Sequence, residues 1–293
     1  MSRPDESLRA AAEEAVRTRD VPGVVTLVWQ GGRILDLHAV GVADVASGQP
    51  MTPDAIFPIA SMSKPVTVAA ALRLMEQGKL RLEDPITRWA PEFADMRVLE
   101  RPDGPLDATY PAPRAITVED LMTHRSGLSY GFMSQGPLAA ALLEAVGFGL
   151  SSSMGPDAWM AALAALPLAC APGERFEYGH SIDVLGFILG RAAGCSFPEV
   201  MRQVLFEPLG MADTGFWVPP DQRGRLVVNA GSPRPGEFVS EPIDSFVTPQ
   251  PPAYASGGQG LLSTARDYLA FASMLVRGGE MADGRLLKAE TMR

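Results

Sequence analysis

Lysine, histidine and cysteine are scarce in this sequence of 293 residues, which holds three, three and two of them. The two cysteines, Cys170 and Cys195, cannot form a cysteine-only zinc site, and no two histidines have the H-x-x-x-H spacing of paired ligands on a helix. A structural metal is therefore not expected. Both cysteines are predicted to be small buried hydrophobic residues in a reducing compartment.

Basic residues are outnumbered as well, with 25 Lys and Arg against 34 Asp and Glu and a formal net charge of −9. Proteins that bind the phosphate backbone of nucleic acids carry a basic surface, so this excess of acidic residues argues against a nucleic-acid partner. No run of about 18 apolar residues occurs, and residues 1–20 lack the apolar segment of a signal peptide. We expect a soluble cytoplasmic protein without a membrane partner, and the sequence leaves its oligomeric state open.

Hydrophobic residues make up 46% of the chain, enough for one large domain or two modest ones. Apolar residues at helical spacing predict a helix over 5–18. A two-glycine turn between runs rich in β-branched residues predicts an antiparallel hairpin with strands at 24–29 and 33–42. A long helix is predicted over about 62–77, because Gly78 stands where a helix usually ends.

The remainder of the chain alternates short helical segments with loops rich in proline and glycine. Prolines predict irregular structure over 97–115 and 218–255, and a return to strand is expected at 257–262. The predicted helices are 118–122, 138–145, 157–165, 181–193, 199–205 and 267–277. The predicted domains are an α/β domain, 1–83 with 198–293, and a mainly helical subdomain, 84–197.

A serine and a lysine stand three positions apart, as Ser61 and Lys64, where an apolar run turns into the long predicted helix. On a helix these two side chains share a face, so the hydroxyl and the amine can form a hydrogen bond. A serine hydroxyl becomes a good nucleophile when a neighbouring base takes its proton. An uncharged amine can do so, and burial and the positive end of a helix both favour that form. Backbone N–H groups of the same helix start can stabilise an oxyanion.

The S-x-x-K pattern is weak by itself, because most lysines near a helix start are simply solvated. Here Lys64 lies among apolar residues in a chain with few lysines, and no other serine has a lysine three places on. The pattern alone leaves a catalytic and a structural interpretation equally open.

Further stretches accompany this pattern in a definite order. They are 59–65, 121–128, 172–178, 183–186 and 257–264. Together they resemble the serine β-lactamase and penicillin-binding-protein superfamily, and most closely the class C β-lactamase-like carboxylesterases called family VIII esterases. The resemblance covers nearly the whole chain. It implies an α+β fold of the β-lactamase/transpeptidase type, with an antiparallel sheet flanked by helices plus a mainly helical subdomain.

In that family a tyrosine of the helical subdomain faces the Ser–Lys pair, and the matching position is Tyr178. A phenolate beside an ammonium can remove the serine proton and later protonate the leaving group. Tyr130 is the alternative for this role. Asp183 and His180 are expected to orient the segment rather than react, and His180 as the base of a triad is a further alternative.

The resemblance implies a serine carboxylesterase that cleaves short-chain acyl esters through an acyl-enzyme, with weak β-lactam hydrolysis as a side activity. Its predicted catalytic residues are Ser61, Lys64 and Tyr178, its partner is a small-molecule ester, and no metal or organic cofactor is implied. The Ser61 backbone N–H is expected to contribute to the oxyanion hole.

Several alternatives stay open. A penicillin-binding-type D-alanyl-D-alanine peptidase, an amide hydrolase and an acyltransferase would share the Ser-Lys-Tyr site. Gly179, His180 and Ser181 imitate the start of a G-x-S-x-G nucleophile elbow, but Asp183 replaces its closing glycine. An alternative of another class is a non-catalytic binding relative, in which Ser61 would not react with a fluorophosphonate or β-lactam probe.

The family's third active-site element is missing from this sequence. Near its C-terminus the family has a strand with K-T-G, or H-x-G or W-x-G in the esterases, and no such triplet follows Gly260. A sheet without its last strands would have an unpaired edge and an uncovered core. The alternatives are a truncated portion and a shortened relative with an impaired site. We expect the first, a truncated portion that lacks the C-terminal part of the sheet and is inactive or poorly soluble by itself.

Overall fold

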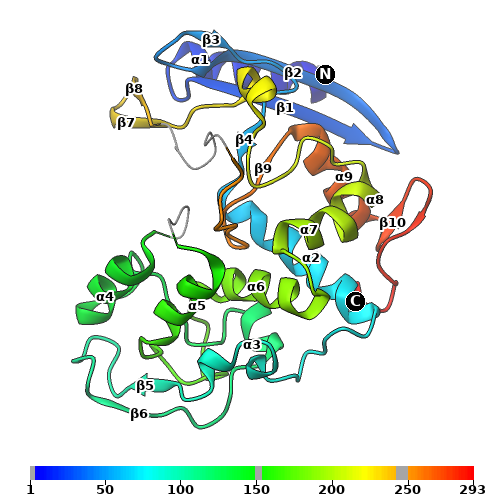
Figure 1. Cartoon of the computed structure of the whole chain (residues 1–293). Coiled ribbons are helices and arrows are strands. Elements are labelled where there is room, and N and C mark those ends of the chain that lie inside the picture. The colour runs from blue at the N-terminus through cyan, green and yellow to red at the C-terminus, as the bar shows by residue number, and fades with distance from the viewer. Residues whose placement is uncertain (1–3, 149–153, 242–249) are drawn as a thin grey trace. The chain divides into compact units, whose positions relative to one another are not determined.

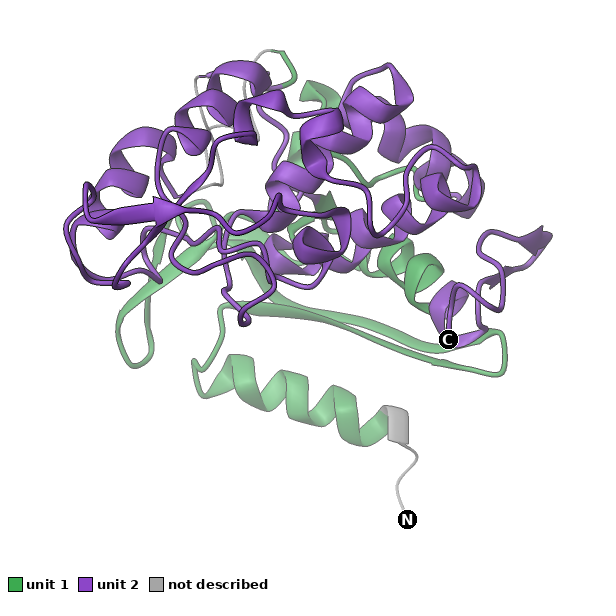
Figure 2. Ribbon diagram, turned by 90° about the horizontal axis from the view of Figure 1, so that it is seen from below, with its two compact units in different colours: residues 1–58, 211–251, 262–272 green, residues 59–210, 252–261, 273–293 purple. Residues whose placement is uncertain are grey.

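The computed structural model describes residues 4–148, 154–241 and 250–293 and consists of two compact units (Figure 2). Unit 1 comprises Met1–Pro58, Met211–Pro251 and Leu262–Ala272. Unit 2 comprises Ile59–Gly210, Pro252–Leu261 and Ser273–Arg293, and it contains every residue of the predicted active site. The predicted domain boundaries stay a prediction; all of 84–197 lies within unit 2.

A helix and a long hairpin open unit 1 (Figure 1). The strands β1 (Gly23–Gln30) and β2 (Arg33–Asp44) pair antiparallel, and β3 (Gln49–Pro50) pairs with the other side of β2. Both glycines of the turn between β1 and β2 have positive φ, a conformation that glycine adopts at no steric cost. Helix α1 (Pro4–Arg17) contacts β1 and β2. The predicted helix and hairpin are confirmed to within two residues at each end.

A second antiparallel pair in unit 1 joins β4 (Phe57–Pro58) to β9 (Leu262–Ser263). The expected strand over 257–262 is wrong for all but its last residue. Its glycine-rich part forms a tight turn, in which the Gly260 N–H donates to the Ser256 carbonyl at 3.0 Å. Glycine-rich sequence weakens a strand because it has little side chain to pack.

A short hairpin also occupies part of the segment predicted to be irregular over 218–255. It consists of β7 (Ala230–Arg234) and β8 (Glu237–Ser240), and Gly236 between them has a φ of +77°. The segment before this hairpin begins with the 3₁₀ turn η5 (Pro220–Arg225), and residues 242–249 of the predicted loop lie outside the described residues. The prolines therefore excluded a long strand but allowed a short pair.

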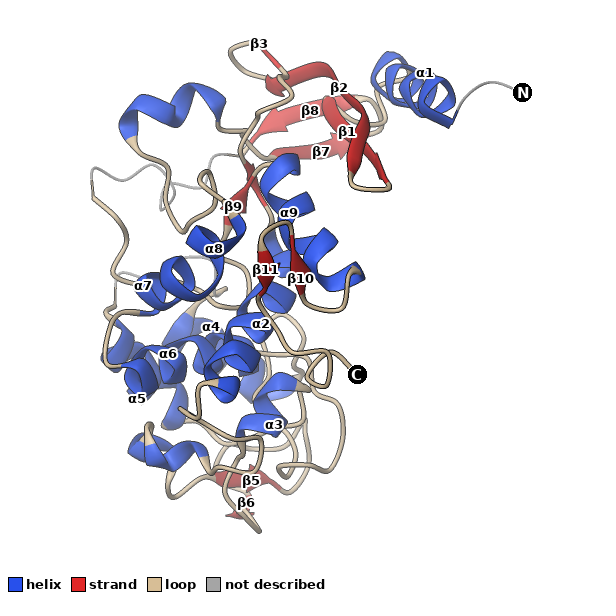
Figure 3. Ribbon diagram, turned by 90° about the vertical axis from the view of Figure 1, so that its right-hand side faces the viewer, coloured by secondary structure: helices blue, strands red, loops and turns tan. Residues whose placement is uncertain are grey.

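Helices dominate unit 2, as Figure 3 shows for the elements between α2 and α8. Helix α6 is central: all residues from Ser181 to Gly190 are buried, and the helix contacts α2, α3 and α7. The helical elements of unit 2 are η1 (Ala60–Met62), α2 (Ser63–Glu76), η2 (Ile86–Arg88), η3 (Pro91–Phe93), α3 (Val118–Met122), α4 (Gly136–Val146), α5 (Pro156–Ala164), α6 (Ser181–Ala193), α7 (Phe197–Met201), the π-helical turn η4 (Arg202–Phe206) and α8 (Glu207–Leu209). The predicted helices at 118–122 and 181–193 are confirmed to the residue, and those at 138–145 and 157–165 are confirmed within two residues. Helix α9 (Ala265–Val276), predicted at 267–277, begins in unit 1 and ends in unit 2.

The proline-rich stretch 97–115 is not wholly irregular, which corrects the prediction. Its two ends pair as β5 (Arg97–Leu99) and β6 (Thr109–Pro111), and the Arg97 guanidinium donates to the Thr109 hydroxyl at 2.6 Å. The prolines lie in the connection or at the strand end, where the ladder needs no N–H donor. One more short pair, β10 (Glu280–Met281) with β11 (Gly284–Arg285), follows α9.

No single helix in the described ranges is long and apolar enough to cross a membrane. The helix pair Ser181–Ala193 and Phe197–Leu209, bent by 80°, reaches that length and apolar composition only when both helices are counted together. Among those residues no group of three or more His, Cys, Asp or Glu side chains could hold a metal ion. Both cysteines are free thiols. Cys170 is buried as expected, whereas Cys195, two residues after the end of α6, is half-buried.

Gly179 is held in a space too small for a side chain. A Cβ atom there would lie 2.2 Å from the Leu128 carbonyl oxygen and 2.4 Å from the Ser129 Cα atom. Gly179→Ala should therefore lower the free energy of unfolding by about 1–3 kcal/mol or more. Urea unfolding measures the change, and Gly224→Ala is the matched control because a Cβ atom there meets no atom within 4 Å. Equal stability of the two variants would contradict this packing.

Candidate active site

Ser61 lies in the short turn η1 that leads directly into α2. The residue before it, Ala60, has a φ of +42°, a left-handed conformation that is rare for any residue except glycine. Such strain costs on the order of 1–3 kcal/mol and persists only where neighbouring contacts enforce it. Here the Ile59 N–H donates to the Leu261 carbonyl at 2.9 Å, and the Met62 N–H donates to the Ile59 carbonyl at 2.9 Å. The strained backbone leaves Ser61 exposed at the start of a buried helix.

Lys64 is the amine partner of Ser61, as predicted from the S-x-x-K spacing. Its side chain is buried, and its Nζ lies 3.1 Å from the Ser61 Oγ. The same Nζ donates to the Gly258 carbonyl oxygen at 2.9 Å and lies 4.7 Å from the centre of the Tyr178 ring. The first turn of α2 therefore aims the amine at the hydroxyl, and the backbone of a distant loop holds it there.

Tyr178 completes the arrangement from the segment before α6. Its hydroxyl lies 2.8 Å from the Ser61 Oγ. The ring packs against the ring of His124 at a centroid distance of 4.8 Å, and the backbone on either side is fixed to that residue. The Glu177 N–H donates to the His124 carbonyl at 2.7 Å, and the Gly179 N–H points to the His124 Nδ1 at 3.4 Å. The three residues predicted from the sequence thus meet within hydrogen-bond distance.

Tyr130, the alternative tyrosine, has a different environment. It is buried, and its hydroxyl points to an Asp183 carboxylate oxygen at 3.3 Å rather than to the serine. Burial raises the pKa of Tyr130, and the negative charge of Asp183 raises it further. Tyr130 therefore stays a neutral phenol at every physiological pH and supports the site as a packed ring, 5.5 Å from the ring of Tyr178.

Asp183 is a fully buried carboxylate with several donors around it. It accepts hydrogen bonds from the Ser256 hydroxyl and from the Gly258 N–H at 3.0 Å, and its other oxygen lies 3.2 Å from the His180 Nδ1. Burial alone would raise the pKa of Asp183, but the hydrogen bonds from His180, Ser256 and Gly258 lower it below its ordinary value. The carboxylate therefore keeps its charge and fixes the loop whose Gly258 carbonyl holds Lys64.

The two alternatives built on α6 do not have the geometry that they require. His180 is completely buried beside Asp183, so it is placed to orient the segment as predicted and not to act as the base for Ser61. Ser181, the nucleophile of the elbow alternative, is also completely buried, and its hydroxyl lies 2.8 Å from the Ser126 hydroxyl. A reacting serine must be reachable by substrate, and of these serines only Ser61 is exposed.

The loop 256–260 is the part of the site that sequence reasoning missed. The sequence predicted strand over 257–262, yet this loop supplies the carbonyl acceptor for Lys64 and two donors for Asp183. Its consecutive glycines were a usable signal, because both are required by close approach. A Cβ atom at Gly257 would lie 2.5 Å from the Ile182 carbonyl oxygen, and one at Gly258 would lie 2.9 Å from the Tyr130 hydroxyl.

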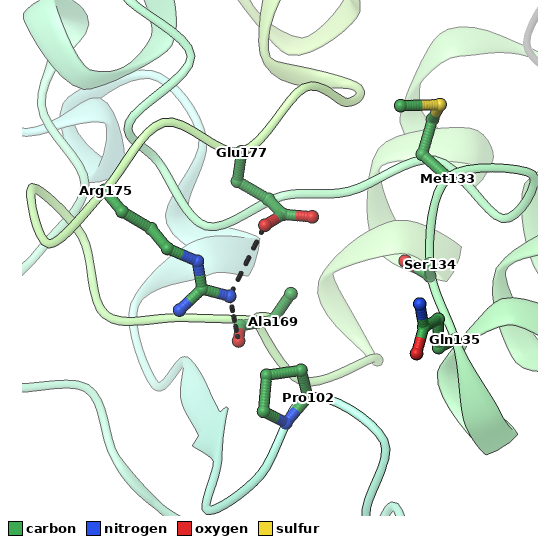
Figure 4. A pocket seen from close by; sticks show the side chains of 7 residues that line it. All are labelled: Pro102, Met133, Ser134, Gln135, Ala169, Arg175 and Glu177. Atoms are coloured by element: carbon green, nitrogen blue, oxygen red, sulfur yellow. Dashed lines mark hydrogen bonds and ion pairs between the residues drawn. The ribbon is translucent and has the colours of Figure 1, made fainter.

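A separate cavity of about 250 Å³ is lined in part by Glu177, the residue before Tyr178 (Figure 4). In it the Arg175 guanidinium lies 3.4 Å from the Glu177 carboxylate and donates to the Ala169 carbonyl at 3.2 Å. None of its lining residues belongs to the Ser61, Lys64 and Tyr178 group. The segment carrying Tyr178 therefore directs Glu177 to the cavity and Tyr178 to the serine.

An α+β fold that brings an exposed serine, a buried lysine and a tyrosine together is that of a serine hydrolase. Residues 8–293 match the family model described as Beta-lactamase. The chain therefore belongs to the β-lactamase family, and its fold is of the β-lactamase/transpeptidase type, as the sequence resemblance implied.

Similar proteins include both uncharacterised and named relatives. Protein Rv1367c of Mycobacterium tuberculosis (strain ATCC 25618 / H37Rv) is 44% identical over 287 residues, which cover 97% of this chain and 70% of that protein. Esterase EstB of Burkholderia gladioli is 32% identical over 278 residues, covering 89% of this chain and 67% of the esterase. Among solved structures, EstCE1, described as a hydrolase with promiscuous acyltransferase activity, has a TM-score of 0.83 at 27% identity and covers 98% of this chain and 75% of its own.

Asp183→Asn tests whether the buried charge holds the site together. The amide NH₂ would face the donors of His180 and Tyr130, so about 1–3 kcal/mol of unfolding free energy should be lost. Turnover of an ester should fall with it, because the Gly258 carbonyl would no longer be held against Lys64. Asp157→Asn is the control, since the Asp157 side chain is 90% exposed in its ion pair and such pairs contribute little. An equal change in the melting temperature of both variants would rule out this structural role of the Asp183 charge.

The burial of His124 makes the stability of the fold depend on pH. Burial lowers the pKa of His124 to about 4, the positive charge of Lys64 adds to the effect, and Asp183 opposes it. The unfolded chain takes up this proton near pH 6.5, so the neutral native histidine stabilises the fold above that pH. About 3 kcal/mol of this stability should be lost as the pH falls from 6.5 to 4.

Urea unfolding of the native protein and of His124→Asn across that pH range measures the effect. Asparagine tolerates the left-handed backbone found here, where φ is +54°, and cannot take up a proton. The stability difference between the two proteins should shrink as the pH falls. A difference that stays constant from pH 7 to 4 would show that His124 does not titrate as described.

Proposed function

We propose that this protein is a carboxylesterase that cleaves short-chain acyl esters through an acyl-enzyme on Ser61. The observation that carries the proposal is the position of the Ser61 Oγ, which lies 3.1 Å from the Lys64 Nζ and 2.8 Å from the Tyr178 hydroxyl. A hydroxyl between two groups that can exchange protons is prepared for nucleophilic attack. The similarity to an esterase supports the same conclusion.

In the first half of the reaction the Ser61 Oγ attacks the ester carbonyl carbon. Its proton passes to the pair formed by Lys64 and Tyr178, and the negative charge moves to the former carbonyl oxygen. The Ser61 backbone N–H at the start of the helix contributes to stabilising that charge. The bond to the alcohol oxygen then breaks, and Tyr178 protonates the departing alkoxide, which leaves an ester of Ser61.

In the second half water attacks the Ser61 ester. Tyr178 takes one proton from the water, the tetrahedral intermediate collapses, and the carboxylic acid leaves while the Ser61 oxygen takes the proton back. An alcohol in place of water would give acyl transfer instead, and the similarity to EstCE1 supports this second activity. A β-lactam would acylate Ser61 by the same first half, with slow hydrolysis as a side activity.

Three variants test the proposal with 4-nitrophenyl acetate as substrate. Ser61→Ala should abolish turnover, and Lys64→Ala and Tyr178→Phe should each lower kcat by about 10²–10⁴-fold, because acid–base groups contribute on this scale. Intact-mass measurement should find an acetyl adduct on the native protein and none on Ser61→Ala. Peptide mapping should place the adduct on Ser61.

Tyr130→Phe is the matched control, because its hydroxyl contacts Asp183 and not Ser61. It should retain kcat within about tenfold, since one supporting hydrogen bond is worth on the order of 1 kcal/mol. The assignment of the tyrosine is wrong if Tyr130→Phe loses turnover while Tyr178→Phe retains it. The function itself is wrong if neither this chain nor a longer version that includes the C-terminal part of the sheet forms an adduct with activated esters.

A further inference from the structure

A run of aromatic rings passes through the reactive centre of unit 2. Tyr178 stacks on Phe176 with ring centres 6.4 Å apart, and on its other side it meets Tyr130 edge to face at 5.5 Å. Tyr130 stacks on Phe132 at 4.9 Å, and Phe132 stacks on Phe148 at 6.3 Å. Only Tyr178 of these five rings has its hydroxyl on the Ser61 Oγ. The reactive hydroxyl therefore lies inside the run, with phenylalanines at both ends.

The phenylalanines of this run are exposed, although Tyr130 within the run is buried. Phe132 is 48% exposed, Phe148 is 62% exposed and Phe176 is 64% exposed. Large apolar side chains normally gain by burial, so a group of exposed rings beside a reactive centre marks a surface that another apolar group covers. Exposed rings also offer stacking geometry to a ligand ring.

Phe148, at the end of the run farther from Tyr178, is hydrogen-bonded to the 256–260 loop. The Gln259 side-chain amide donates to the Phe148 carbonyl oxygen at 2.9 Å, and the next residue back, Gly258, holds Lys64 through its own carbonyl. Phe176, at the other end of the run, packs against His124, with ring centres 5.7 Å apart. The exposed rings are thus fixed to the same backbone segments that fix the reactive groups.

We propose that the alcohol part of the ester substrate carries an aromatic or bulky apolar group, which Phe132, Phe148 and Phe176 bind. The inference rests on the proposed esterase function, in which Tyr178 protonates the departing alcohol oxygen. Because Tyr178 belongs to the run of rings, the group attached to that oxygen emerges among them.

The test compares esters with equally poor leaving groups. For the native protein, kcat/KM for 2-phenylethyl acetate should exceed that for ethyl acetate by about tenfold or more. Phe132→Ala, Phe148→Ala and Phe176→Ala should each lower kcat/KM for the phenylethyl ester about two- to tenfold, the scale of one aromatic contact. Phe132→Ala and Phe148→Ala, whose rings stack on Tyr130 and on each other rather than on Tyr178, should leave kcat/KM for ethyl acetate unchanged within about twofold, and Phe132→Trp should restore the phenylethyl preference.

Tyr110→Ala is the control for loss of an exposed ring, because Tyr110 is 40% exposed on β6 and is not part of the run. Ethyl 3-phenylpropanoate places the same phenyl group on the acyl side. The inference is overturned if the ring variants slow only this acyl-side ester, if they slow both acetates equally, or if the native protein shows no preference. If neither this chain nor the longer version hydrolyses any of these esters or forms an adduct, the esterase function fails, and this inference fails with it.

Discussion

The buried carboxylate of Asp183 is the interaction on which the site depends. A charge without access to water must be surrounded by donors, and here His180, Ser256 and the Gly258 N–H supply them. Satisfying this one charge fixes the backbone of the 256–260 loop against α6. The same loop then presents the Gly258 carbonyl to Lys64, so a demand for hydrogen bonds in the core determines where the amine meets Ser61.

Burial also gives two neighbouring tyrosines different surroundings. Tyr130 is enclosed beside a negative charge, so its phenol stays protonated and its ring serves as packing. Tyr178 is half-buried, lies under the amine of Lys64 and has its hydroxyl on Ser61. His124, kept neutral by burial and by Lys64, adds no competing positive charge. Rings only 5.5 Å apart thus have different chemistry because their surroundings differ.

The same rings relate catalysis to substrate choice. A protein that buries Trp159 and Tyr130 completely could bury more phenylalanine, yet Phe148 and Phe176 remain open to solvent. Their positions along the chain are far apart, and only the folded backbone assembles them around Tyr178. A surface of this kind stabilises a bound apolar group at some expense of the free protein's own stability, which is a common balance at binding sites.

The sequence by itself determined the local elements and the Ser61–Lys64 pair. Spacing of apolar residues and a two-glycine turn gave the first helix and hairpin, and i, i+3 geometry placed the amine beside the hydroxyl, because these interactions act within a few residues. Resemblance added Tyr178, 117 residues from its partner. Only the tertiary structure decided that 256–260 is a turn serving Lys64 and Asp183, that the ends of 97–115 pair, and that scattered phenylalanines join in one run. Such contacts depend on which distant segments share the interior, and no local pattern of residue types encodes that.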